Sequence, residues 1–472
     1  MTKRRMIASA PEPLEAYTSQ FDALFGKSNQ REAFRWYVEG LLLPSERNKT
    51  LTGLVNTEPI VGAQLPRVQK LQWFLSESNW EERQLQAKRL QLLRENAATA
   101  PTAQGALGID ETGDRKDGHH TAHVARQYLG NVGKIENGVV SVSSLWADED
   151  VYYPLDVEPY TPESYFADGK NDPAFRTKPQ IALQLVQRAQ ALDWPFRAVV
   201  ADSLYGEDRG LRAGLRQAQA PYVLALNPAH AWWHPTGVAG SVKEVARSAG
   251  WVSAERPGRW VQITRTFRDS SEQVWWAVEI VAGPYGPGKA ERAVVATTDP
   301  ATLPDLTTWY LVTNLPAPVN DVEASPFPPA DLAEIVRLYG LRTWVEQNYK
   351  HVKHALGWSQ YQVRSDTAMR RHWQLVCCAF SFCWYYVSQL GASAGEAFPQ
   401  PPASAALSET GGSATGPGAR KKNQRRNDQA APTLLASSSA SGSCLAGAVD
   451  YAATLLESVV RTAPSWSAPG AV

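Results

Sequence analysis

The chain has 472 residues, and its 47 Lys and Arg side chains equal its 47 Asp and Glu side chains in number, so the formal net charge is zero. This balance excludes a wholly basic coat protein for nucleic acid and a wholly acidic tail protein, but it does not exclude local charged patches. Hydrophobic residues make up 43% of the chain, which is enough for a buried core, and the length favours about three domains.

The first segment, residues 12–98, carries apolar residues at helical spacing with charged residues between them. It is predicted as an N-terminal helical domain. The stretch that follows, residues 97–105, is rich in Ala and Thr and is typical of a linker.

From residue 106 the pattern changes to short apolar runs separated by Gly, Asn and Asp, which is typical of strands joined by turns. Farther along, predicted helices alternate with buried strands. Residues 106–227 are therefore predicted as the first part of an α/β sheet with helices packed on it.

Residues 228–306 lose this alternation and are predicted as antiparallel strands, which together make a β-rich insertion. Residues 307–390 return to the α/β pattern. They begin with a buried strand and continue with two predicted helices, over 329–356 and 367–390. The second part of the α/β core is expected here.

The last segment, residues 391–472, is rich in Ala, Ser, Gly and Pro. Such low-complexity composition cannot bury enough apolar surface to fold, so this tail is predicted to be mostly disordered. A basic cluster over 419–426 interrupts it, and 451–461 could form a short helix.

The cysteines point to a reducing compartment. Cys377, Cys378 and Cys383 lie in one apolar stretch, and no CxxC pair or zinc-finger spacing occurs. The N-terminus develops no apolar signal segment, and the longest apolar run, 375–387, is only about 13 residues long, too short for a membrane span. We therefore expect a cytoplasmic protein that is not inserted in a membrane.

Two carboxylates follow predicted strands: Asp110 ends the run LGID, and Asp202 ends the run AVVAD. Active sites of open α/β sheets gather at the carboxyl ends of strands. Each aspartate taken alone also fits a turn or a helix cap.

A polar tetrad lies on the predicted helix 329–356: Tyr339, Arg342, Glu346 and Lys353, with the spacing Y-x2-R-x3-E-x6-K. Offsets of three, four and seven place these residues on one face of a helix. Taken alone, this pattern also fits a solvated face with an Arg–Glu pair four residues apart.

The tetrad lies in a basic segment. Residues 337–372 contain seven Lys and Arg, including Lys350 and Arg364, against two acids. Such a patch predicts salt-dependent binding to DNA phosphates. His351 and His354 are expected on the same phosphate-facing side, because two histidines without a third ligand make a poor zinc site.

Several phrases in this order resemble the IS701 family of insertion-sequence transposases, which belongs to the IS4 group of DDE enzymes. The resemblance extends over about residues 20–390. The phrases are QKLQWFLSESNW (69–80), DETG (110–113), ARQYLG (125–130), DSLYG (202–206), WVEQNYKHVKHALGW (344–358) and YQVRS (361–365).

This resemblance implies an RNase H-like catalytic core of α/β class, interrupted by an antiparallel β-rich subdomain and flanked by the N-terminal helical domain and the disordered tail. The implied catalytic and metal-binding residues are Asp110, Asp202 and Glu346. They would hold two Mg²⁺ ions, for which Mn²⁺ can substitute, with Asp110 bridging both ions. The implied activity is cleavage and strand transfer of DNA by in-line phosphodiester chemistry.

The implied substrate is double-stranded DNA, both the inverted repeats at the transposon ends and the target. Tyr339 and Arg342 are expected to contact the transposon-end backbone, and Lys350, Lys353 and Arg364 to contact phosphates. Residues 12–98 would supply a DNA-binding domain. A homodimer on DNA, associated with a bacterial nucleoid, is expected.

Paired tryptophans occur in the β-rich insertion, and strand pairs of this kind usually place one side chain in the core and one at the surface. The functional alternative is a stacking platform for a flipped base at the transposon end. The candidate residues are Trp232, Trp233, Trp275 and Trp276.

Two acids near Asp110 are assigned to other roles. Glu111 is the next strand residue and should point to the opposite face of the sheet. Asp114 is a candidate for supporting the metal ligands, but a role in a turn is favoured.

Two other function classes fit part of the sequence. A catalytically silent DNA-binding protein derived from a transposase would be favoured by loss of a carboxylate, yet Asp110, Asp202 and Glu346 are all present. A glycosidase would use two carboxylates and aromatic platforms. That reading leaves the tetrad and the basic segment unexplained.

Overall fold

The computed structural model describes residues 12–43, 47–130, 132–234, 237, 239–266, 272–281, 283, 291–318 and 325–394. The tail predicted over 391–472 lies outside the described residues, except that 391–394 end the last helix. The basic cluster over 419–426 and the short helix over 451–461 also lie outside them.

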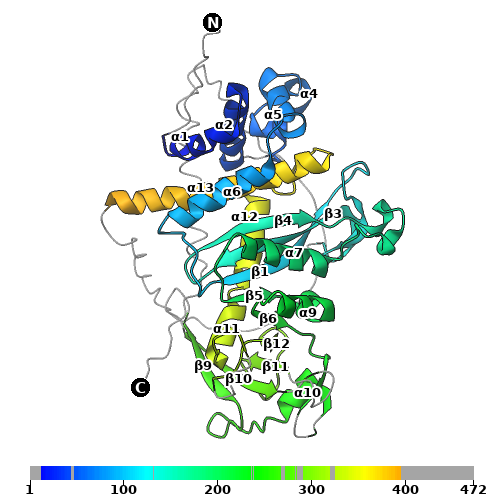
Figure 1. Ribbon diagram of the computed structural model, residues 1–472, viewed down its shortest axis with the longest axis vertical. Helices are drawn as coiled ribbons and strands as arrows, with labels where there is room; N and C mark the ends of the chain where they lie inside the picture. Colours follow the sequence, from blue (N-terminus) through cyan, green and yellow to red (C-terminus); the bar gives the residue numbers. More distant parts are fainter. Residues whose placement is uncertain are drawn as a thin grey trace, which may run out of the picture.

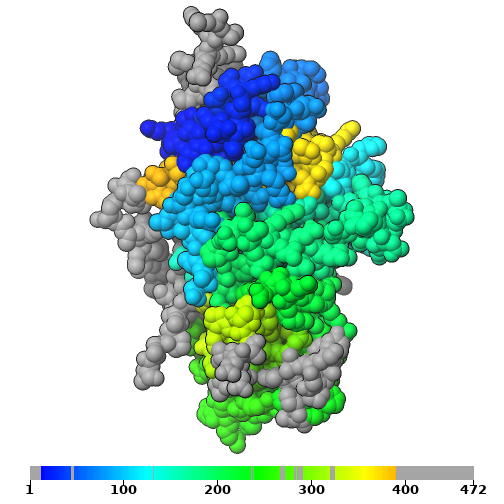
Figure 2. Space-filling view, viewed as in Figure 1, coloured from blue at the N-terminus to red at the C-terminus, as the bar shows by residue number. Residues whose placement is uncertain are grey.

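The N-terminal region is helical, as predicted. Its elements are α1 (Glu12–Thr18), a 3₁₀ turn η1 (Ser19–Leu24), α2 (Ser28–Leu42), α3 (Leu51–Leu54), α4 (Pro59–Gly62), α5 (Pro66–Ser76) and α6 (Glu82–Glu95). They gather at one end of the molecule on α13 (Asp366–Ala394), which runs across the molecule beneath them (Figures 1 and 2). Helices α1, α2, α5 and α6 all contact α13, so the region shares its core with the C-terminal helix.

Helix α13 includes the apolar run that the sequence predicts as a buried helix. Cys377, Cys378 and Cys383 lie in it as buried free thiols. No helix in the described part of the chain is long and apolar enough to cross a membrane. Because other helices and strand β4 cover α13, its apolar composition reflects core packing.

The centre of the molecule is one mixed ten-stranded sheet, in the order β2-β3-β1-β5-β6-β12-β11-β10-β9, with β4 paired to β3 (Figure 1). Its strands are β1 (Ala106–Arg115), β2 (Ala125–Leu129), β3 (Lys134–Ala147), β4 (Tyr152–Pro159), β5 (Ala198–Ala201), β6 (Tyr222–Ala225), β9 (Val261–Thr266), β10 (Glu272–Val281), β11 (Arg292–Thr297) and β12 (Thr308–Thr313). Strands β1, β5 and β6 run parallel, whereas β3 pairs antiparallel with β1 and β4. The α/β class is therefore confirmed.

Short helices connect and cover these strands. They are η2 (Glu163–Tyr165), η3 (Gly169–Asn171), α7 (Lys178–Ala191), α8 (Ser203–Gly206) and α9 (Arg209–Gln217). Helix α7 begins at a capping box in which Thr177 and Gln180 satisfy each other's backbone N–H groups. Its buried face packs on β3 and β4.

The segment 228–306 contains antiparallel strands, as predicted, and three of them extend the central sheet. Strand β11 pairs with β12, and β10 and β9 follow outward in the same sheet. A separate two-stranded ribbon joins β7 (Ala231–Trp233) to β8 (Ala239–Ser241), and α10 (Val242–Arg247) follows it. The β-rich segment is thus continuous with the core sheet through β12.

The prediction of a single helix over 329–356 is wrong, because the structure has two helices there. Helix α11 (Leu332–Gly340) ends before Leu341, and α12 (Thr343–His354) begins after Arg342. Helix α11 packs on β5, β6 and β10, whereas α12 packs on β1 and β4. The break lets each half follow a different part of the twisted sheet.

Candidate active site

Two carboxylates are brought together by neighbouring parallel strands. Ile109 of β1 lies opposite Ala201 of β5, the last paired position between these strands. Asp110 and Asp202 come directly after that pair, so they lie side by side where β5 ends. Asp202 also caps α8, because its Oδ1 accepts a hydrogen bond from the Leu204 N–H at 3.0 Å.

The third carboxylate approaches from α12, and one arginine contacts all three. Arg342 Nη2 lies 3.0 Å from Asp110 Oδ2 and 3.9 Å from Asp202 Oδ2. Its Nη1 lies 3.3 Å from Glu346 Oε1, one helical turn along the chain. The break between α11 and α12 holds Arg342, so a single cation faces three anions that come from three different elements.

Asp110 is the most enclosed of the three acids. Its side chain is 12% exposed, compared with 37% for Asp202 and 67% for Glu346. Burial raises the pKa of Asp110 to about 7; the charge of Arg342 opposes this rise, and the charge of Asp202 adds to it. The buried acid therefore lies beside a partner acid that raises its pKa and a cation that lowers it.

The chemistry of these side chains fits hard divalent cations, which prefer carboxylate oxygens. Within the residues that the structure describes, no group of three or more His, Cys, Asp and Glu side chains is close enough to hold one ion. The Arg342 guanidinium lies between the acids instead. A metal at this place would take over the neutralising charge that Arg342 provides here.

The tetrad does not lie on one continuous helix, because Tyr339 is near the end of α11 whereas Glu346 and Lys353 are on α12. Burial raises the pKa of Tyr339, which still lies close enough to Arg342, Asp202 and Asp110 for their charges to act on it. Tyr339 is 9% exposed, and its ring packs edge-on against Trp309 at 5.1 Å between centroids. Lys353 Nζ donates to the Gly113 carbonyl at 2.8 Å and pairs with Asp114 at 2.9 Å. Because the helix breaks at Arg342, the residues on either side of the break contact different parts of the sheet.

The remaining basic candidates differ in exposure. Lys350 and Arg364 are exposed, so their side chains are accessible to a polyanion. The expectation for His351 is wrong: it is buried, and its Nδ1 lies 2.8 Å from the Tyr152 hydroxyl. Burial lowers the pKa of His351 to about 4, so this imidazole is neutral and belongs to the core.

The two neighbouring acids have clear partners. Glu111 pairs with Lys178 of α7 at 2.7 Å, on the face opposite Arg342, as predicted from strand alternation. The turn predicted for Asp114 is wrong, because this residue is 1% exposed within β1 and pairs with Lys353. A buried strand acid needs an internal cation, and Lys353 supplies it.

The four tryptophans proposed for base stacking mostly lie in the core. Trp232, Trp275 and Trp276 are 2%, 3% and 8% exposed, whereas Trp233 is 37% exposed. Trp275 packs on Trp309 at 4.4 Å between ring centroids. The alternation expected for a strand pair holds for Trp232 and Trp233, while Trp275 and Trp276 are both covered.

Sequence reasoning missed Tyr349. Its hydroxyl donates to the Asp110 carbonyl at 3.1 Å and lies 2.7 Å from the Ser143 hydroxyl, so it ties α12 to β1 and β3 beside the acid. Its position three residues after Glu346 places it near that acid on the helix, which was the available signal. Its apolar neighbours favoured a packing role instead.

Comparisons with known proteins agree with the resemblance drawn from the motifs. Residues 20–279 match a family model described as DDE superfamily endonuclease. A probable transposase for insertion sequence element IS701 from Microchaete diplosiphon is 32% identical over 364 residues, which cover 77% of this chain and 85% of that relative. The family match includes Asp110 and Asp202 and ends before Glu346.

Proposed function

Because the chain belongs to the DDE superfamily endonucleases, with an IS701 transposase among its relatives, we propose that it cuts and joins DNA at the ends of a mobile element. The observation that carries this proposal is the meeting of Asp110, Asp202 and Glu346 around Arg342. Three acids with one cation leave an excess of negative charge. A site of this kind suits added cations.

The strand arrangement supports an RNase H-like core for this reaction. Antiparallel β4, β3 and β1 are followed by parallel β5 and β6, and the two aspartates lie on the adjacent central strands β1 and β5. We propose that residues 106–227 and 307–390 form this core, with 228–306 as the inserted β-rich part.

We assign Asp110, Asp202 and Glu346 as ligands of two Mg²⁺ ions, for which Mn²⁺ can substitute. These ions, when bound, would activate the attacking oxygen and stabilise the leaving oxygen of the phosphodiester. The protein's own part is to hold the acids on three packed elements. Tyr349 and Lys353 are positioning residues, because both hydrogen-bond to the backbone of β1 beside Asp110.

Arg342 has two tasks in this proposal. Without metal it neutralises the acids, and once they are neutralised otherwise its guanidinium can bind the phosphate of the DNA. Exposed Lys350 and Arg364 would hold neighbouring phosphates. Tyr339, which packs on Trp309, would support Arg342 from α11 rather than reach far into solvent.

The partner in this proposal is double-stranded DNA, both the element's ends and the target, bound by a homodimer in the bacterial cytoplasm. Residues 12–98 would contribute a DNA-binding domain. Among the four tryptophans, Trp233 alone is exposed enough to stack on a base.

The test uses purified protein and labelled DNA that carries the element's own ends, with Mg²⁺ or with EDTA. The wild type is compared with Asp110→Asn, Asp202→Asn and Glu346→Gln. We expect Mg²⁺-dependent nicking at the end, lost in all three variants while DNA binding survives. The matched control is Glu111→Gln, whose acid lies on the opposite face of β1 and should leave nicking intact.

Binding without nicking by the wild type, with no difference among these proteins, would support the alternative of a catalytically silent DNA-binding protein. Nicking that persists in any of the three variants would remove that acid from the site.

A further inference from the structure

A large groove separates the N-terminal helices from the segment that follows α12. Its volume is about 1110 Å³, and α3, α4 and α5 line one side while residues 362–365 line the other. The groove uses none of the three acids, and neither the family match nor the relative assigns a role to it.

One face of α5 presents a row of polar side chains to this groove. Gln69, Gln72 and Ser76 are spaced by three and four residues, which places them on one face of the helix. Leu71 and Leu75 on the other side of α5 are buried. The helix is thereby fixed by its apolar face, and the glutamine row stays exposed.

The facing wall is tied to the strand that carries Asp110. Lys116 Nζ, just after β1, donates to the carbonyls of Ser359 and Tyr361 at 3.0 and 3.2 Å. The Ala122 N–H donates to the Arg364 carbonyl at 2.8 Å. These hydrogen bonds fix the position of residues 359–364 relative to β1. A ligand in the groove would therefore lie at a fixed position relative to the acids.

The groove is lined by side chains of the kinds that bind bases and phosphates in nucleic acids. Amide side chains, as in Gln69 and Gln72, both donate and accept hydrogen bonds, and glutamine pairs bidentately with adenine in the major groove. Arg47 and Arg364 add positive charge, against one acid, Glu77. Guanidinium groups bind phosphates or guanine edges.

We propose that this groove binds the duplex DNA of the element's ends and that α5 reads its bases through Gln72, with Gln69 beside it. Arg364 holds a phosphate on the opposite wall. This inference rests on the proposed function, which it deepens by naming the surface that recognises the end.

Duplex DNA fits the groove better than a protein segment does. Most lining residues carry amide, hydroxyl or guanidinium groups, but apolar atoms supply as much of the exposed surface as polar ones do. A polyanion is therefore favoured over a peptide by the charge of the lining, two arginines against one acid. The exposed apolar residues Ile60 and Val61 of α4 do not line the groove. Charge complementarity with phosphate follows from the two arginines.

The experiment measures binding of an end duplex and of a scrambled duplex at several salt concentrations. Gln72→Ala should weaken binding to the end roughly tenfold and leave the scrambled duplex unchanged, because a base contact is lost. Arg364→Ala should weaken both duplexes equally and lower the salt slope by about one, because a phosphate contact is lost.

The matched controls are Gln262→Ala on β9 and Arg256→Ala between α10 and β9, which are exposed residues far along the sheet from the N-terminal helices (Figure 1). All four side chains are exposed, and equal urea midpoints verify that each variant folds. Wild-type nicking is measured on the same end duplex in parallel.

Two results separate the inferences. If the wild type nicks the end but Gln72→Ala and Arg364→Ala bind as the wild type does, the groove inference fails and the proposed function stands. If the wild type neither nicks nor distinguishes the end, the proposed function fails first. Binding of the end that is weakened equally by the controls would also overturn the groove inference.

Discussion

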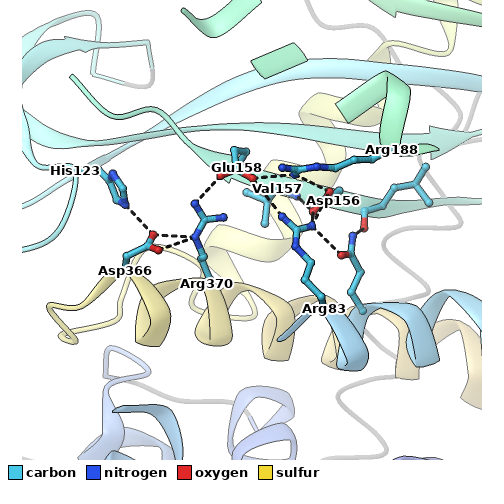
Figure 3. Close-up of polar contacts among 10 residues, drawn as sticks. Arg83, His123, Asp156, Val157, Glu158, Arg188, Asp366 and Arg370 are labelled. Carbon is cyan, nitrogen blue, oxygen red and sulfur yellow. Dashed lines mark hydrogen bonds and ion pairs between the residues drawn. The ribbon is translucent and has the colours of Figure 1, made fainter. Parts of the chain in front are cut away.

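Two groups of arginine and acidic side chains lie against the central sheet, and they differ in the balance of their charges. Around Arg342, one guanidinium meets three carboxylates. Around β4, three arginines meet three carboxylates, as Figure 3 shows. We call the first group the Arg342 site and the second the β4 network.

The β4 network joins separate elements through complete pairs. Glu158 Oε2 lies 2.8 Å from Arg188 of α7 and 3.2 Å from Arg83 of α6, and its other oxygen lies 2.5 Å from Arg370 of α13 (Figure 3). Asp156, two residues before it on the same strand face, pairs with Arg83 and Arg188. Cations and acids here satisfy one another.

The acid pKa values move in opposite directions in the two groups. Burial works to raise the pKa of Glu158, but the hydrogen bonds and charges of Arg370 and Arg188 hold it below its usual value. At the Arg342 site, burial raises the pKa of Asp110 to about 7 despite Arg342. A balanced group stabilises its charges, whereas an unbalanced one is strained until cations are added.

The largest effect is expected on the nicking rate, which should depend on the Arg342 site and not on the β4 network. Asp202→Asn removes a partly exposed acid that lies 3.9 Å from the Arg342 guanidinium, a weak pairing, and Asn also caps a helix well, so stability should change little. Nicking should fall by more than about a hundredfold, since even outer partners of metal ligands cost 10- to 100-fold. Single-turnover nicking rates measure this, with Glu158→Gln as the comparison.

Glu158→Gln should nick at a rate within a few-fold of wild type when the rate is measured well below the unfolding temperature of the variant. A comparable loss of rate in Glu158→Gln would mean that the β4 network takes part in the chemistry.

The next effect concerns stability in the β4 network. Glu158→Gln should lower the free energy of unfolding by roughly 1 to 3 kcal/mol at pH 7, less than a fully buried pair, because Arg83 and Arg188 are partly exposed. The folded pKa is lowered, so this contribution exists above the unfolded value of 4.5 and disappears as the pH falls through the folded value. Urea unfolding from pH 7 to pH 3 should show the two proteins converge in acid.

The opposite sign is expected at Asp110. Its folded pKa is raised from 3.8 to about 7, so wild-type stability without metal falls as the pH rises through this range. Asp110→Asn removes the penalty and should be more stable than wild type by roughly 1 to 3 kcal/mol at pH 8 in EDTA. The difference should vanish near pH 4, and a less stable variant at pH 8 would contradict the account.

The smallest effect is expected at Arg342. Arg342→Gln leaves the three acids without their shared cation, yet Asp110 can take up a proton, so the loss of stability in EDTA should be only about 1 kcal/mol. Mg²⁺ should then stabilise the variant more than it stabilises the wild type. Unfolding midpoints with and without Mg²⁺ measure this, and an equal Mg²⁺ effect in both proteins would count against the neutralising role.

Local pattern predicted much of the fold and the positions of the site acids. The apolar runs before Asp110 and Asp202 identified buried strands, and the resemblance to the IS701 family singled out Glu346 as the third acid. The parallel pairing of β1 with β5 brings the two aspartates together, and this pairing is not visible in the local sequence pattern. The strands of 228–306 were also predicted, but a period of two does not tell which strand pairs with β12.

Long-range partners explain what the sequence did not predict. Apolar spacing continues through the break before Arg342, so one helix was predicted where the twisted sheet requires two. Arg342 contacts Asp110 across 232 positions of the chain. Lys353 faces inward because it pairs with Asp114, which is buried in β1. The local sequence around either residue does not reveal this partner.

The central claim is that the Arg342 site collects metal ions and the β4 network does not. In the complex with end DNA, Fe²⁺ would replace Mg²⁺, and ascorbate with peroxide would generate hydroxyl radicals that cut the polypeptide near bound iron. The account predicts cuts close to Asp110, Asp202 and Glu346, suppressed by excess Mg²⁺ and lost in Asp202→Asn. Cuts close to Asp156 and Glu158 instead, or cuts at the site that survive in Asp202→Asn, would contradict it.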